Sequence, residues 1–145
     1  MKRKILLFAL ILGMTALTAC VPKPEEVNAV VESFWEHWKA GNADKMADLM
    51  TDTVEMGIMM HVTSAEVADK GIPGSDLAEF LVTELPLATY PGVTFSIKST
   101  ELFEKYAIVE TLISADPDFH LAIIFHLQST DDGWKISFMG LTSTT

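Results

Sequence analysis

The fold is decided by residues 91–138, which read PGVTFSIKSTELFEKYAIVETLISADPDFHLAIIFHLQSTDDGWKISF. Apolar and polar side chains alternate through most of this stretch, and residues 106–115 are more continuously apolar. In an extended chain every second residue faces the same side, so alternation indicates a strand with one buried face. A turn at 91–92 begins the stretch, and turn residues divide it at 116–118 and 131–133. The pattern predicts four hairpin-linked strands, at about residues 93–98, 106–115, 119–128 and 134–138, followed by a frayed polar tail at 142–145.

Helical spacing dominates the preceding part of the chain. Apolar residues recur at helical spacing from Val27 to Trp38, with Pro24 at the start and Gly41 as a stop, which predicts a helix over residues 24–40. A second, short helix is expected from Asn42 to near Thr51. A third is expected between Ser75 and Pro86.

The segment between the second and third helices is less regular. Residues 53–62 predict a strand, although their methionines also suit a helix. Residues 65–70 are either its partner strand or a loop. Helices that precede an antiparallel meander predict an α+β fold. The alternation also predicts an inner face that contains Phe95, Ile97, Trp134, Ile136 and Phe138.

Two stretches resemble the nuclear transport factor 2-like superfamily. Residues 30–50, VVESFWEHWKAGNADKMADLM, are similar to its opening helix pair, and residues 132–137, DGWKIS, to its closing strand. The resemblance implies a cone in which a curved antiparallel sheet wraps around N-terminal helices. This superfamily includes isomerases, dehydratases, ligand binders and dimerisation modules, so the resemblance implies no single function.

The chain begins with the segments of an export signal in their usual order, a basic segment followed by an apolar one. Three cations at residues 2–4 precede an apolar run at 5–19. That run is shorter than the roughly 20 residues of a membrane-spanning helix. Residues 17–20, Leu-Thr-Ala-Cys, resemble the lipobox of bacterial lipoproteins at all four positions. The resemblance implies lipid attachment at Cys20 and cleavage after Ala19; the alternative is an ordinary signal with a chance cysteine.

This reading divides the chain into three parts. Residues 1–19 are a signal that is removed, residues 20–24 are the lipidated Cys20 and a short tether, and residues 25–145 form one domain. Cys20 is the only cysteine, so an internal disulfide is excluded. Because Val21 rather than Asp follows it, the lipoprotein resemblance favours an exported protein in the outer membrane where the source has one.

The charge of the chain excludes one class of partner. The signal holds three of the 10 basic residues, so the remainder has 7 basic against 20 acidic residues, a formal net charge of −13. Such a domain repels phosphate backbones, and nucleic acid is not expected as a partner. It should also avoid lying flat on an anionic membrane. The sequence has no nucleophile elbow, catalytic cysteine or glycine-rich phosphate loop.

Glu110 interrupts an otherwise apolar predicted strand and shares a face with Tyr106, Ile108 and Leu112. If that face lined the interior, Glu110 would be a buried general base, with His126 on the next strand as its partner. If the face pointed outward, Glu110 would be solvated or in a dimer interface. The apolar side chains of residues 119–127 place His126 on the opposite face, so the catalytic pair requires the less apolar face to line the cavity.

Three groups of residues contain side chains of the types that bind metal ions. His120 and His126 lie roughly 20 Å apart along one strand and cannot share an ion. Residues 116–120 offer two carboxylates and a histidine, in a pattern typical of a solvated turn. Residues 56–61 hold three methionines and His61, which suit Cu(I) but more commonly fill a core. We predict neither metal nor cofactor.

The function expected from these patterns is noncatalytic binding of a small apolar ligand inside the cone. The candidate ligand-binding residues are Trp38, Met56, Tyr106, Glu110 and His126. A second hypothesis is a homodimerisation or protein-interaction module of the envelope, because Ala122 and Ile124 need cover on the other sheet face. A third is an isomerase or dehydratase that uses Glu110.

Overall fold

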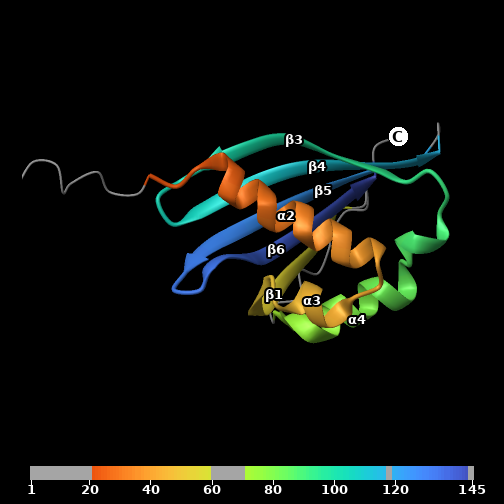
Figure 1. The fold of residues 1–145 in the computed structure, drawn as a ribbon, viewed down its shortest axis with the longest axis horizontal. Helices are drawn as coiled ribbons and strands as arrows, with labels where there is room; N and C mark the ends of the chain where they lie inside the picture. The colour runs from red at the N-terminus through yellow and green to blue at the C-terminus, as the bar shows by residue number, and fades with distance from the viewer. Residues whose placement is uncertain (1–20, 60–70, 117–118, 144–145) are drawn as a thin grey trace, which may run out of the picture.

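A six-stranded sheet forms the body of the structure, a computed structural model that describes residues 21–59, 71–116 and 119–143. Its spatial order is β2-β1-β6-β5-β4-β3. Figure 1 shows helix α2 lying across one face, with α3 and α4 near β1. The strands are β1 (Met50–Met59), β2 (Ile72–Pro73), β3 (Thr94–Leu102), β4 (Tyr106–Asp116), β5 (Phe119–Thr130) and β6 (Gly133–Ser143); the helices are α2 (Pro24–Lys39), α3 (Ala43–Ala47), α4 (Gly74–Glu84) and the 3₁₀ turn η1 (Leu87–Thr89).

The α+β class predicted from the sequence is confirmed, and the four C-terminal strands form the predicted meander. The sheet is mixed rather than purely antiparallel, because β1 runs parallel to β6 and pairs Met56 with Met139. The two strands are far apart in the sequence. Turn residues reveal only hairpins between neighbouring strands, so this pairing left no local signal.

Helix α2 has nearly the predicted bounds, Pro24–Lys39. Pro24 suits the first turn, where its missing N–H costs nothing, and two glutamates follow it at the positive end of the helix dipole. Gly41 adopts φ +73° just beyond the helix, a conformation that favours glycine. The helix buries one stripe of side chains, Val27, Val31, Phe34, Trp35 and Trp38.

Helix α3 is shorter than predicted, since it ends at Ala47 and β1 already begins at Met50. The backbone N–H of Ile136 donates to the Leu49 carbonyl at 2.9 Å, and Met50 pairs with Ile136. Pairing with β6 therefore overrides the local helix preference of this segment. The predicted strand at 53–62 starts earlier, and its end, together with the segment at 65–70, lies outside the described residues.

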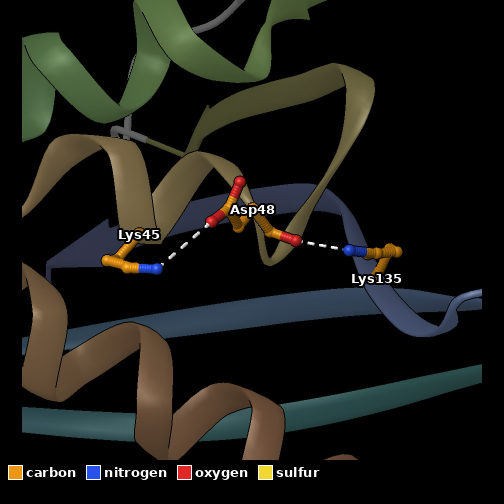
Figure 2. A network of polar contacts seen from close by, with 3 residues as sticks. All are labelled: Lys45, Asp48 and Lys135. Atoms are coloured by element: carbon orange, nitrogen blue, oxygen red, sulfur yellow. Dashed lines mark hydrogen bonds and ion pairs between the residues drawn. The ribbon is translucent and has the colours of Figure 1, made fainter.

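A hydrogen bond from Lys135 joins the end of α3 to the sheet (Figure 2). Lys135 Nζ on β6 donates to the backbone carbonyl of Asp48, the residue that follows α3. The Asp48 carboxylate lies 3.9 Å from Lys45 Nζ, in an exposed pair. Exposed ion pairs of this kind stabilise little, so the contact with the carbonyl matters more for holding the short helix in place.

The core lies between α2 and the inner face of the sheet. Phe34 is fully buried, and its ring packs edge-on against Trp38 at 6.1 Å and Phe125 at 5.7 Å between centroids. Phe125 lies on β5, so this aromatic group joins the helix to the middle of the sheet. Trp35 stacks on Phe95 of β3 at 5.0 Å and extends the same contact toward the sheet edge.

Two predictions about the last strand are corrected. A bulge between His126 and Leu127 shifts the register of β6, which leaves Ile136 buried but pairs Phe138 with His126. One extra residue in a strand reverses the facing of every side chain beyond it, so Phe138 lies on the outer face. The predicted fraying is wrong for residues 142–143, because Thr142 pairs with both Ala122 and Met59; residues 144–145 lie outside the described part.

Candidate functional site

A cavity of about 400 Å³ lies at the end of the molecule where α2 finishes and the chain passes from α4 into β3. None of its lining residues carries a charge, and only Trp38 and Tyr90 have a polar side-chain atom. The lining residues are Trp38, Leu85, Leu87, Tyr90, Pro91, Val93, Ile113, Ala115 and Leu121. The volume lies within the range of small-molecule sites, roughly 300–1,000 Å³.

Trp38 contributes an apolar wall to this cavity. Its side chain is 1% exposed, and its Nε1–H donates to the carbonyls of Leu81 at 3.1 Å and Leu85 at 3.0 Å. These bonds satisfy the one polar group of the indole and fix the end of α4 against α2. The ring therefore offers its carbon surface to the cavity.

Tyr90 provides the one hydroxyl of the lining. It follows η1, its backbone N–H donates to the Leu87 carbonyl at 3.1 Å, and its side chain is 53% exposed. Because Tyr90 both lines the cavity and is half in water, this residue lies where the cavity meets solvent. A ligand in the cavity would meet apolar carbon throughout, with one hydrogen-bonding group near the rim.

The five candidate ligand-binding residues do not form one site. Trp38 lines the cavity. Met56 on β1 is partly buried and packs against the core, but it is not among the residues that line the cavity. Tyr106, Glu110 and His126 all lie on the outer face of the sheet, away from the helices. Of the five candidates, only Trp38 lines the cavity.

Glu110 lacks the burial that a role as general base inside the cone requires. The buried residues of β4 are Ala107, Val109, Thr111 and Ile113, so the alternate positions face outward. Glu110 is exposed and accepts a hydrogen bond from Ser99 Oγ at 2.9 Å. It pairs across the sheet with Ile124, while His126 pairs with Ile108. The two residues share the outer face, on the opposite side of the sheet from the cavity.

His126 belongs to a polar depression of about 650 Å³ on that outer face, lined also by Glu55, Gln128 and Phe138. Its ring lies 4.6 Å from that of Phe138, at 36°. Desolvation by this packing lowers the pKa of His126 below its ordinary value of 6.5, and the Glu55 carboxylate opposes the shift. Folding therefore favours the neutral imidazole over the charged one, relative to the unfolded chain.

That lowered pKa makes the stability of the fold dependent on pH. Below pH 6.5 the unfolded chain binds the His126 proton more readily than the folded chain, so stability falls as the pH drops from 6.5 toward the folded pKa. We expect His126→Gln to remove this part of the dependence, measured as urea unfolding between pH 7.5 and 5. His37→Gln controls for the loss of a histidine; equal slopes for both variants would contradict the assignment.

The sequence predicts little of this cavity. Residues 85–93, LPLATYPGV, supply five of its lining side chains. Leu85 ends the predicted third helix and Val93 begins a predicted strand, whereas the residues between them, with two prolines, show neither helical nor strand periodicity. Its one signal was an apolar composition in a segment too irregular for either element. Ile113, Ala115 and Leu121 lay within predicted strands, but no pattern indicated that a space would remain beside them.

Two further features, a metal-binding cluster and a membrane-spanning helix, are absent from the described residues. Among residues 21–59, 71–116 and 119–143, no group of three or more His, Cys, Asp or Glu side chains is placed to hold a metal ion. In the same ranges, no helix combines the length and apolar character needed to cross a membrane. The predicted signal and Cys20 lie outside the described residues.

Comparison of the fold with solved structures gives many matches. A nuclear transport factor 2 (NTF2)-like protein of unknown function from Shewanella baltica OS155 superposes with a TM-score of 0.63 at 12% identity, over 88% of this chain and 98% of that one. An NTF2-like protein from Methylobacillus flagellatus KT gives 0.65 at 14% identity, over 89% and 98%. A candidate scytalone dehydratase from Novosphingobium aromaticivorans DSM 12444 gives 0.57 at 13% identity, over 83% of each chain.

Sequence comparison is less informative than comparison of the fold. No protein-family model matches the chain, and no curated protein matches it in sequence. At identities of 12–14% the structural likeness concerns the arrangement of elements and carries no activity with it. The chain has the NTF2-like fold, with a curved mixed sheet of six strands and N-terminal helices.

Proposed function

We propose that the protein is a lipid-anchored envelope protein whose cavity binds a small apolar molecule without transforming it. The observation that carries the binding role is the cavity of about 400 Å³ with its uncharged lining. Such a surface gains free energy by removing apolar ligand surface from water, roughly 25 cal/mol per Å². The anchor is supported by the sequence alone, through the lipobox resemblance that ends at Cys20.

The absence of charge from the lining favours binding over catalysis. General acid–base chemistry needs a titratable side chain within hydrogen-bond reach of the reacting group. The described lining residues include no Asp, Glu, His, Lys or Arg, and Glu110 lies on the other face of the sheet. The likeness to a candidate dehydratase therefore brings no matching carboxylate into this cavity.

Filling the cavity should abolish ligand binding. Ala115 lines it, so Ala115→Phe places a phenyl ring in the ligand's space. A ligand at 100 times its Kd is expected to stabilise the native chain by about 2.7 kcal/mol and the filled variant by nothing. The measurement is thermal unfolding against a library of lipophilic compounds, with native mass spectrometry of the protein from its own envelope to detect a retained molecule.

Ala122→Phe is the matched control, because Ala122 lies on the same sheet but on its outer face. It should respond to the ligand as the native chain does. If no library member stabilises the native chain under conditions that work for a known binding protein, the binding role is contradicted. If Ala115→Phe and Ala122→Phe lose the response equally, the ligand does not occupy this cavity.

The outer face of the sheet favours a second function, a homodimerisation module. Partly exposed apolar side chains lie on three strands there, with Leu112 on β4, Ala122 and Ile124 on β5, and Phe138 on β6. Soluble monomers rarely leave large apolar patches in water, and a second copy would cover this one through a two-fold interface.

A charge at the centre of that face should separate such a dimer. Ile124→Glu places a carboxylate where two copies would meet, and desolvating it would weaken association by several kcal/mol. We expect a dimer mass for the native chain and a monomer mass for this variant by light scattering. Ser33→Glu, an equal change at an exposed position of α2, should leave the mass unchanged. A native chain that is monomeric at all concentrations would contradict the dimer.

A further inference from the structure

The two ends of the molecule expose different surfaces. Figure 1 shows the start of α2 and the turn between β3 and β4 at one end, while α4 and the segment leading into β3 lie toward the other. A hydrogen bond of 2.7 Å from Thr100 Oγ1 to Asn28 Oδ1 joins β3 to the early part of α2. The cavity lies at the opposite end, beside the last turn of α2.

An exposed aromatic pair lies at the end where α2 begins. Phe103 and Tyr106 stack at 4.2 Å and 13°, although 38% of one and 48% of the other are in water. The Phe103 N–H donates to the Tyr106 carbonyl at 2.9 Å, which closes the turn and holds the two rings together. Val21, just before α2, is 78% exposed. These three are most of the large apolar side chains that the described residues expose; the others are Phe80 and Tyr90.

The predicted tether is too short to hold this end away from a bilayer. Only residues 21–23 separate Cys20 from the first residue of α2. Three extended residues span about 10 Å at most. With acyl chains on Cys20, the first turn of α2 and the β3–β4 turn beside it would lie at the level of the lipid headgroups.

We infer that the end defined by Val21, Phe103 and Tyr106, hereafter the aromatic end, rests on the bilayer that holds the lipid of Cys20, so that the cavity faces away from the membrane. The inference rests on the lipid anchor proposed above. Phenyl and phenol rings suit the headgroup region, where one part of the ring is in apolar surroundings and the hydroxyl is in water. Lys105, between them, can extend its amine outward along the surface.

The charges near the aromatic end indicate which lipid surface it fits. Lys23 and Lys105 are accompanied by four carboxylates, Glu25, Glu26, Glu101 and Glu104, and all six side chains are exposed. This mixture does not attract an anionic surface, because the carboxylates oppose the negative headgroups. A zwitterionic surface is therefore the partner, and docking should be weaker on anionic vesicles.

The orientation has a consequence for the proposed ligand. Helix α2 has 16 residues and is about 24 Å long at 1.5 Å per residue. Its first turn is at the aromatic end and Trp38, in its last turn, lines the cavity. A ligand would then enter from the aqueous side or from another protein, because the bilayer that holds the anchor lies a helix length away.

The test compares two fluorescent labels on the full-length lipidated chain in phosphatidylcholine vesicles. Glu104→Cys places an environment-sensitive NBD (nitrobenzoxadiazole) label at the aromatic end, and Glu84→Cys is the matched change at the end of α4. The thioether at Cys20 leaves no other free thiol. We expect blue-shifted emission and protection from aqueous iodide at position 104 and neither at 84. Phe103→Ser with Tyr106→Ser should lower the docked-to-free ratio at 104 about tenfold, whereas Phe80→Ser should not.

Each outcome of this experiment supports or contradicts the proposed orientation of the domain on the membrane. Protection at 104 alone, lost in the double variant and weaker in phosphatidylglycerol vesicles, supports the inference. Equal protection at 84 and 104 means that the domain lies flat, and exposure at both means that it stands off; either result overturns the orientation and leaves the anchor intact. An intact mass without acyl chains overturns the anchor itself, and the inference with it.

Discussion

Replacing Phe34 with alanine is expected to lower the free energy of unfolding by about 3–5 kcal/mol, as for other large aromatic residues removed from cores. Phe34 has no exposed surface and lies between Trp38 and Phe125, where it joins α2 to the middle of the sheet. Its removal would leave a cavity that neither ring can fill without losing its own contacts. Urea unfolding followed by circular dichroism gives the measurement.

Phe80→Ala on α4 is the matched control, since Phe80 is 47% exposed. Surface substitutions of this kind usually change stability by no more than about 0.5 kcal/mol. A Phe34→Ala variant within about 1 kcal/mol of the native chain would mean that α2 contributes little to the core. The NTF2-like arrangement would then have to be stable through the sheet alone.

The helix that contains Phe34 was largely predictable from the sequence. Its apolar stripe, the proline at its first turn and the glycine beyond its end all indicate the same element, and the observed bounds, Pro24–Lys39, differ by one residue at the C-terminal end. The strands of the meander were predictable for the same reason, because alternation and turn residues agree with one another. The secondary structure of a segment is predictable where several local signals indicate the same element.

Non-local pairing is where local signals failed. Met50 belongs to β1 because β6 lies beside it, and nothing in its neighbours' propensities indicates that strand. The bulge at His126 likewise moved Phe138 to the outer face although its local alternation is regular. Register and parallel pairing depend on residues far away in the chain, which a window of ten or twenty residues does not contain.

The candidate site shows a different limit of prediction from sequence, namely which face of a strand covers the core. On β4 one face holds Val109 and Ile113 and the other Ile108 and Leu112, so both faces look apolar. A period of two tells which side chains share a face without telling which face covers the core. Only the observed burial shows that Glu110 points to water. Trp38 was identified because helical periodicity does indicate which side of α2 is buried.

Replacing Cys20 with alanine is expected to release the protein from membranes, the largest effect that any single substitution should have on where the chain is found. Each buried methylene of an acyl chain contributes about 0.8 kcal/mol to membrane binding, so the loss of the acyl chains lowers partitioning by several orders of magnitude. The described residues hold no helix able to replace the anchor. The measurement is fractionation of cell envelopes together with the intact mass of the isolated chain.

The intact mass shows whether the chain has kept its signal and whether it has gained lipid. Thr15→Ala is the control, because Thr15 lies in the signal ahead of the lipobox and its replacement should keep both lipid attachment and cleavage. A Cys20→Ala chain that still contains residues 1–19 would remain associated through its uncut apolar segment, and its greater mass would identify it. A native chain that begins at Cys20 without added lipid would show that the signal is an ordinary one. The short tether would then no longer hold the aromatic end at a bilayer, and the stacked Phe103 and Tyr106 would more simply contact another protein.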